Sequence, residues 1–320
     1  MARTSLTVAI LTFRRPEQLR ANLEGVRKHT AEALDRTDPR IVVIDNDPAG
    51  SARTTVEAIA ATWAETEPVP LVYVHEPRPG IAAARNRALD ESGDSRLLSF
   101  IDDDEIPESG WLTALVDVWS STRADAVTGR VVARLPAGTD PWVASSVFFQ
   151  RTSYATGTVR PAAGAGNLLL DLNTVRRFGL RFDESLGLAG GEDTLFTSQL
   201  TQKGGTIVWC QESIAVDPVI PERATRSWVR TRAFAQGNAT QDRRLRVATT
   251  GSRRQWARAR GVAGGAARMS TGALRAAWGL GTRDPGRQQR GESQFWRGWG
   301  ILRGSFGHRF EEYGREQTAA

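Results

Sequence analysis

Four short apolar runs in the first third of the chain, each followed by a polar cluster, constrain the fold more than any other feature. The runs cover residues 6–11, 41–44, 71–74 and 96–101, and the clusters cover 12–15, 45–47, 75–80 and 102–105. Segments with the apolar spacing of amphipathic helices separate several of the runs. This alternation predicts an α/β fold, with a mostly parallel, Rossmann-like sheet flanked by helices. Functional loops follow the carboxyl ends of such strands, where all four clusters fall.

The alternation loosens after residue 107, and the last hundred residues have a different character. Residues 125–133, 167–172, 206–210 and 213–216 are expected strands, and 192–203 is an expected helix. After Pro221 the pattern becomes helical and rich in arginine and tryptophan. We therefore expect a body over residues 1–220 and a basic helical C-terminal extension over residues 221–320.

The charge divides the chain in the same place. Residues 1–220 carry 22 basic and 29 acidic side chains, whereas residues 221–320 carry 20 basic and 7 acidic ones. The extension also holds five of the ten tryptophans. This asymmetry indicates an acidic catalytic body and a basic, aromatic extension that contacts an anionic partner.

The chain has few cysteines and histidines, which limits the kinds of catalytic and metal-binding sites that it can form. The single cysteine, Cys210, excludes a disulfide framework and a cysteine zinc site. The three histidines are far apart in the sequence, so the chemistry is expected to depend on carboxylates. Residues 6–11 are too few for a secretory signal, and no stretch is apolar enough to span a bilayer, so we expect a cytoplasmic protein.

The first carboxylate cluster, Asp102–Asp103–Asp104, directly follows an expected buried strand. Adjacent carboxylates at the edge of a core repel one another unless a cation neutralises them. Oxygen ligands of this kind suit Mn²⁺ or Mg²⁺, which bind one or two carboxylates together with substrate phosphates. The alternative is a solvated loop that caps the helix after Ser109.

The second cluster, Gly190–Gly191–Glu192–Asp193, lies where the expected helix 192–203 begins. Glycine allows a ligand to approach the backbone closely, and a carboxylate beside it can act as a general base. The alternative is ordinary capping of a helix N-terminus by an acidic residue.

Together these segments resemble glycosyltransferase family 2, whose members have the GT-A fold. The resemblance covers about residues 5–220. The matching stretches are 7–16 (TVAILTFRRP), 41–47 (IVVIDND), 80–86 (GIAAARN), 100–107 (FIDDDEIP) with 111–112 (WL), 182–184 (FDE) and 191–193 (GED). Each stretch is weak alone, but their shared order is specific.

The resemblance implies an inverting, metal-dependent transfer of a sugar from a nucleotide diphosphate sugar to a hydroxyl or amine. It implies that Asp193 is the base and that Glu192 and Gly191 orient or bind the acceptor. Asp104 and Asp102 are the implied ligands of Mn²⁺ or Mg²⁺. The implied donor-binding residues are Thr12, Phe13, Arg15, Asp45, Asn46, Arg85, Asp102 and Asp103. The nucleotide-sugar half is expected over about residues 1–107 and the acceptor half over about 108–220.

Two positions depart from the family pattern. Relatives usually carry two consecutive acids in the loop after the second strand, and the second of these is Asn46 here. A uridine diphosphate (UDP) sugar remains the first candidate donor, with thymidine (dTDP) and guanosine (GDP) diphosphate sugars as alternatives. Many relatives place a histidine metal ligand after the last strand of the body, where this chain has Asp217. Asp217 is either a replacement oxygen ligand or the start of a turn.

Two other functions stay open from the sequence. The basic extension with interleaved aromatic residues is compatible with a nucleic-acid-binding protein, and the sheet with a nucleotidyltransferase. The acidic body and the lack of a nucleic-acid-binding motif favour glycosyl transfer, so no nucleic-acid partner is expected. The expected acceptor is a polysaccharide, a lipid-linked sugar or a small molecule.

The extension itself has two interpretations. Its helices either pack on the body, close the acceptor site or form a homodimer, or they contact anionic lipid at the inner face of the plasma membrane. In the second case the expected interfacial helix contains Trp296, Arg297, Trp299, Arg303, Phe306 and Arg309.

Overall fold

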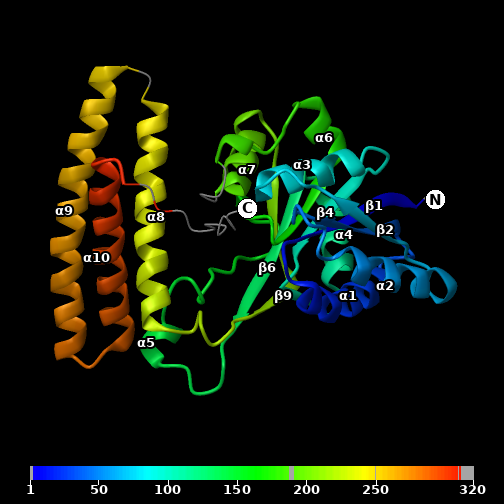
Figure 1. Cartoon of the computed structure of the whole chain (residues 1–320), viewed down its shortest axis with the longest axis horizontal. Coiled ribbons are helices and arrows are strands. Elements are labelled where there is room, and N and C mark those ends of the chain that lie inside the picture. The colour runs from blue at the N-terminus through cyan, green and yellow to red at the C-terminus, as the bar shows by residue number, and fades with distance from the viewer. Residues whose placement is uncertain (1–2, 187–190, 249, 309, 311–320) are drawn as a thin grey trace. The chain divides into compact units, whose positions relative to one another are not determined.

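The computed structural model describes all residues except 1–2, 187–190, 249, 309 and 311–320 (Figure 1). Arg309 and the glycine before Gly191 therefore lie outside the described residues. The described chain forms two compact units. The first contains residues up to 132, then 152–186 and 191–218, and the second contains 133–151 and the residues from 219 onward.

The first unit begins with the predicted parallel βαβ arrangement. Four parallel strands lie in the order β3, β2, β1, β4. Their bounds are β1 Thr4–Thr12, β2 Thr37–Asp45, β3 Leu71–His75 and β4 Leu97–Asp102. The helices that connect them are α1 Pro16–Ala31, α2 Arg53–Thr66 and α3 Ile81–Glu91.

The sheet continues beyond β4 with antiparallel strands, in the order β8, β6, β9, β5, and β7 pairs with β9. Their bounds are β5 Ile106–Pro107, β6 Ala126–Arg134, β7 Val159–Arg160, β8 Asn167–Asp171 and β9 Ile207–Pro218. The remaining helices of this unit are α4 Trp111–Thr122, α6 Leu172–Arg177, a 3₁₀ turn Glu184–Leu186 and α7 Glu192–Gln202. The two short strands expected at 206–210 and 213–216 are one continuous strand, β9, in which Cys210 is buried.

Two apolar layers hold the helices on opposite faces of this sheet. Because side chains alternate along a strand, Val8 and Ile10 of β1 face the layer that contains Leu19 and Leu23 of α1. Ala9 faces the opposite layer, which contains three buried alanines of α3, Ala82, Ala84 and Ala88. The small side chains of α3 allow its backbone to lie close to the strand ends.

The second unit is largely helical, as expected for the basic extension. It contains the short helix α5 Pro141–Ala144 and three long helices, α8 Arg226–Val247, α9 Gly251–Gly281 and α10 Pro285–Ser305. Helix α10 packs against both α8 and α9 (Figure 1). Trp142, Val143 and Val229 form a small core between α5 and α8. Within the described residues, every helix is too short or too polar to cross a bilayer.

Glycines set the spacing between α9 and α10. A Cβ atom on Gly272 would lie 2.6 Å from the backbone nitrogen of Phe295, closer than atoms can approach. Gly264, on the same helix, has free space around it, with only the end of the Arg268 side chain at 3.6 Å. A larger residue is therefore excluded at position 272 but fits at position 264.

We expect Gly272→Ala and Gly264→Ala to change stability in opposite directions. Gly272→Ala forces the helices apart and should lower the free energy of unfolding by about 1–3 kcal/mol. Gly264→Ala adds helix propensity without a clash and should raise it by about 1 kcal/mol. Thermal unfolding of both variants measures the effect, and equal shifts in one direction would contradict the close approach at Gly272.

Candidate active site

The polar clusters meet at one edge of the sheet, as the strand alternation predicted. In the register of the parallel strands, Thr12 lies beside Asp45 and Leu11 lies beside Asp102. Asp45 in turn lies beside His75. The carboxyl ends of β1, β2, β3 and β4 therefore bring all four polar loops to the same edge.

Arg15 and Thr12 hold the aspartate cluster. Arg15 donates hydrogen bonds from Nη1 to Asp103 Oδ1 at 3.2 Å and to Asp104 Oδ2 at 3.1 Å. Thr12 Oγ1 donates to Asp103 Oδ2 at 2.8 Å. Burial still raises the pKa of Asp103 above its ordinary value, although Arg15 and Thr12 both act to lower it. The cluster is therefore only partly neutralised by the protein.

The segment 164–166 joins the two predicted carboxylate clusters. A Cβ atom on Gly166 would lie 3.1 Å from Asp102 Oδ2 and 2.7 Å from Glu105 Oε1, so both carboxylates face this backbone. One residue earlier, the Ala165 amide donates to Asp193 Oδ2 at 3.3 Å. Asp102, Glu105 and Asp193 thus surround three consecutive small residues.

Sequence reasoning missed Glu105 and the segment 164–166 as parts of this site. Glu105 is buried, and it follows the aspartate cluster directly in the sequence. The run Gly164–Ala165–Gly166 before an apolar strand was the available signal, because small residues permit close approach to the backbone.

Asp102 has the most perturbed acidity of the site. Burial raises the pKa of this carboxyl to about 6, and the negative charges of Asp104, Asp103 and Asp193 add to the rise. The Arg85 guanidinium opposes the shift without cancelling it. An acid in this state favours a cation or a proton beside it.

Glu192 and Asp193 occupy different environments although they are adjacent. Glu192 is buried and forms an ion pair with Arg85, and its Oε2 atom has no hydrogen-bond partner among the described residues. Asp193 is partly exposed in the first turn of α7 and accepts a hydrogen bond from the Thr194 amide. Gly191, with φ of 88°, provides the left-handed backbone that starts this helix.

The Asp45 carboxylate stabilises the loop that begins at this residue. Its carboxylate is fully buried and accepts hydrogen bonds from the amides of Asp47 at 3.0 Å and Ala52 at 2.8 Å. Tyr73 Oη donates to it at 3.1 Å, and burial together with the Asp45 charge raises the pKa of Tyr73 to about 12. Phe13, directly after the last residue of β1, is half-buried, with the Arg14 guanidinium 5.1 Å from its ring centre.

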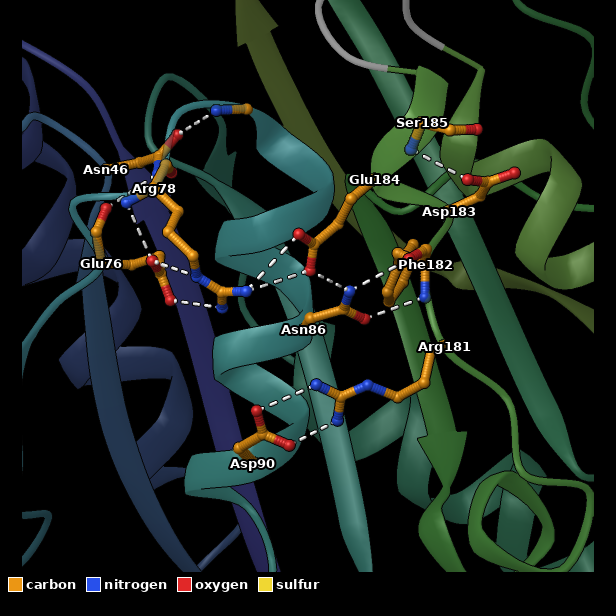
Figure 2. A network of polar contacts seen from close by, with 11 residues as sticks. Asn46, Glu76, Arg78, Asn86, Asp90, Arg181, Phe182, Asp183, Glu184 and Ser185 are labelled. Carbon is orange, nitrogen blue, oxygen red and sulfur yellow. Dashed lines mark hydrogen bonds and ion pairs between the residues drawn. The ribbon is translucent and has the colours of Figure 1, made fainter.

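Asn46 holds the loop after β3 in place through hydrogen bonds from its side-chain amide. Its Nδ2 donates to the carbonyl oxygens of Glu76 at 2.9 Å and Arg78 at 2.6 Å, and its Oδ1 accepts from the Gly80 amide at 3.2 Å (Figure 2). Both ends of the amide are therefore bonded to the backbone of residues 76–80. The predicted loop residue is in place, and its side chain shapes the loop.

A polar network extends from this loop to the segment that precedes the second carboxylate cluster (Figure 2). Arg78 pairs with the buried Glu76 at 2.9 Å and reaches Glu184 at 3.5 Å. Asn86 of α3 donates to Glu184 at 2.9 Å and to the carbonyl oxygen of Phe182 at 3.0 Å. The loop after β3, helix α3 and residues 182–184 are thereby joined.

Asp217 lies near the aspartate cluster in the sheet register. Ile106 of β5 pairs with Val216 of β9, so the next position along places Asp217 opposite Glu105. Asp217 is the penultimate residue of β9. Its role as an oxygen ligand stays a prediction.

The donor set of this edge fits a hard divalent cation. Asp102 and Glu105 direct carboxylate oxygens to the same point beside Gly166, and oxygen ligands suit Mg²⁺ or Mn²⁺. In the described part of the chain, no three histidine, cysteine or acidic side chains are grouped closely enough to hold a metal unaided.

Comparison with known proteins assigns the class. The sequence profile described as Glycosyl transferase family 2 matches residues 7–177, more than half of the chain. The chain therefore belongs to this family and is a glycosyltransferase. It is 35% identical over 254 residues to the succinoglycan biosynthesis protein ExoM of Rhizobium meliloti (strain 1021), and the match covers 78% of each chain. The predicted family is confirmed, in preference to the two other functions that the sequence left open.

Solved structures share the fold at low sequence identity. The mannosyltransferase PcManGT from Pyrobaculum calidifontis, in complex with GDP-Man and Mn²⁺, superposes with a TM-score of 0.56 at 19% identity, over 92% of this chain and 86% of that chain. S. aureus TarS superposes with a TM-score of 0.51 at 16% identity, over 73% of this chain and 40% of that chain. The chain thus spans less than half the length of TarS. The predicted α/β fold is confirmed.

The raised pKa of Asp102 predicts that replacing its carboxylate with a neutral side chain stabilises the folded protein. Between about pH 4 and pH 6 the folded protein keeps a proton on Asp102 that the unfolded chain has released. Through this group, the free energy of unfolding falls as the pH rises through that window and stays low above it. Asp102→Asn should therefore raise the unfolding temperature in EDTA at about pH 8, and raise it less at about pH 5.

The exposed Asp38→Asn variant is the matched control and should change little at either pH, since Asp38 is a surface residue of β2. Circular dichroism melts measure both variants. A lower unfolding temperature for Asp102→Asn than for the wild type at the higher pH would contradict the buried, repelled charge.

Asn46→Asp should loosen the loop after β3 although it preserves the shape of the side chain. The carboxylate cannot donate to the carbonyl oxygens of Glu76 and Arg78, and each unmet buried group costs about 1–3 kcal/mol. We expect a lower unfolding temperature and faster proteolysis within residues 76–80. The exposed Asn173→Asp serves as control. If the two variants behave alike, Asn46 does not hold the loop.

Proposed function

We propose that the protein transfers a sugar, with inversion, from a nucleotide diphosphate sugar to an acceptor hydroxyl or amine, with Mn²⁺ or Mg²⁺ bound. The observation that carries this proposal is the segment 164–166, around which Asp102, Glu105 and Asp193 gather. One end of the site thus carries ligands for a metal and a diphosphate, and the other carries a partly exposed carboxylate. A transfer by single displacement needs both the metal and diphosphate site and a carboxylate that acts as a base.

On the donor side, Asp104 and Asp102 are the proposed metal ligands. Asp217 could join them only by moving closer when the metal binds, because no three such side chains are grouped among the described residues. The bound cation supplies Lewis-acid stabilisation of the departing diphosphate. Asp103, held by Thr12 and Arg15, orients the donor hydroxyls. Phe13 stacks on the base.

Arg85 has a second proposed role beside its ion pair with Glu192. Its guanidinium lies close enough to Asp102 to lower the pKa of that carboxyl, so it reaches the edge where the diphosphate binds. A charge-assisted hydrogen bond from Arg85 to the diphosphate is then available. Glu192 keeps the guanidinium in place.

Asp193 is the proposed base. As the acceptor oxygen attacks the anomeric carbon, its proton passes to the Asp193 carboxylate, and the bond from that carbon to the diphosphate oxygen breaks on the opposite face. Asp193 is suited to this step because it is partly exposed, whereas Glu192 is buried against Arg85. Glu192 and Gly191 orient the acceptor side.

The nucleotide is selected by the loops after β2 and β3. Asp45 and Asn46 are bonded within these loops, so they act by fixing the backbone that the base meets. A UDP-sugar is the first candidate, and dTDP- and GDP-sugars are the alternatives. TarS, whose structure was solved with UDP-GlcNAc, and PcManGT, solved with GDP-Man, illustrate two of these donor classes.

The proposal extends to the organisation and surroundings of the enzyme. Residues 1–107 form the nucleotide-sugar half, residues 108–220 the acceptor half, and residues 221–320 a separate extension. The acceptor is a polysaccharide, a lipid-linked sugar or a small molecule. We propose a cytoplasmic enzyme, peripheral at the inner face of the plasma membrane, with a homodimer as the other use of the extension.

The deciding experiment measures nucleotide diphosphate release from UDP-, dTDP- and GDP-sugars with Mn²⁺, with Mg²⁺ or with EDTA. We expect release from one nucleotide class, loss in EDTA and recovery on metal addition. In the same assay Asp193→Asn should lower kcat by about 10²–10⁴-fold while donor affinity, measured by calorimetry, is retained.

Asp38→Asn is again the surface control and should leave kcat unchanged. Full release in EDTA would refute metal dependence. A normal rate for Asp193→Asn together with a large loss for Glu192→Gln would move the base to Glu192.

A further inference from the structure

The face of α9 that is turned away from its buried glycines carries large apolar side chains that are mostly exposed. Steps of seven, four, seven and four residues lead from Trp256 through Ala263 and Ala267 to Leu274 and Trp278. These steps follow the helical period, so the five residues form one line, here called the α9 apolar stripe. The exposed fractions of Trp256, Leu274 and Trp278 are 64%, 71% and 66%.

The inner face of the same helix is occupied by glycine. The fully buried residues of α9 are Gly261, Gly265, Gly272 and Gly279. Helix α10 approaches on this side, where the glycines bring the two backbones together. A helix packed in water buries its large apolar side chains and exposes its small ones, and α9 does the reverse. Small residues between helices with large apolar ones outside are the arrangement found where lipid surrounds the helices.

The charge on α9 has a single sign. The helix carries six arginines and no acidic residue over Gly251–Gly281. Arg253, Arg260, Arg268 and Arg275 recur at steps of seven, eight and seven, which places them in a row along one side of the stripe. The Arg260 guanidinium lies 5.2 Å from the Trp256 ring centre, and that of Arg287 on α10 lies 5.9 Å from the Trp278 ring centre. Each exposed indole is therefore accompanied by a cation.

We propose that the α9 apolar stripe and its row of arginines bind the surface of an anionic lipid bilayer. The helix lies in the plane of the interface, with the indole rings at headgroup level and the guanidinium groups on lipid phosphates. It does not insert across the bilayer, because α9 is not apolar enough to span it. The inference needs no catalytic step, so it stands or falls separately from the proposed transfer reaction.

One of the two interpretations of the extension placed the interfacial helix at residues 296–309, whereas the surface proposed here lies on α9. Trp296 and Trp299 are half-buried on α10, which packs between α8 and α9. Tryptophan therefore contributes to helix packing on α10, whereas on α9 it is mostly exposed.

The test is sedimentation of the full-length protein with vesicles of phosphatidylcholine, with and without phosphatidylglycerol. We expect the wild type to pellet only with the anionic vesicles and to be released by salt, since screening weakens the contact. Arg260→Gln combined with Arg275→Gln should weaken partitioning about thirtyfold, given the typical contribution of each basic side chain at such a surface. Trp256→Ser combined with Trp278→Ser should weaken it about tenfold or more.

Val159→Ser removes an equally exposed apolar side chain, 65% exposed, from the first unit and should pellet like the wild type. Circular dichroism verifies that each variant is folded. A wild type that stays in the supernatant with both vesicles overturns the proposal, as does a tryptophan variant that pellets normally. If the tryptophan variant instead loses a dimer seen by light scattering, or if a DNA duplex binds while vesicles do not, the occupant is a second copy or a nucleic acid and the proposal fails.

Discussion

The organisation of the catalytic unit depends on mutual repulsion among the carboxylates at the end of β4. Asp102, Asp103 and Asp104 are adjacent, and burial raises the pKa of the first two. Arg15 and Arg85 offset part of this repulsion from opposite sides of the sheet edge. In the function proposed here, a divalent cation with a bound diphosphate relieves the remaining negative potential, which lowers the stability of the protein without them.

Polar side chains that could be taken for ligand-binding residues instead hold the loops around this cluster in place. Asp45 accepts three hydrogen bonds within its loop and from Tyr73, and Asn46 uses both ends of its amide on the backbone of residues 76–80. Further bonds from Arg78 and Asn86 reach Glu184, which precedes the second carboxylate cluster. The loops after β2 and β3, helix α3 and residues 182–184 are thus parts of one hydrogen-bonded framework (Figure 2).

The second unit follows a different packing rule. In the first unit, branched aliphatic side chains from the strands and helices fill two layers. In the second, glycines let α9 and α10 approach closely, and among the described residues Trp256, Leu274 and Trp278 of α9 are mostly exposed on the other face of that helix. We propose that the first unit binds the nucleotide sugar and that the second unit contacts lipid.

The amino-acid sequence by itself determined the parallel strands, the polar clusters after them and the family, because these depend on local periodicity and on short motifs. It did not reveal that Gly164–Ala165–Gly166 joins Asp102 to Asp193, or that Arg85 pairs with Glu192, since those contacts join residues far apart in the chain. Nor did it show that tryptophans of α9 are mostly exposed while Trp296 and Trp299 of α10 are half-buried. Only tertiary packing decides which face of a helix is covered, because coverage depends on the neighbour and not on the helix.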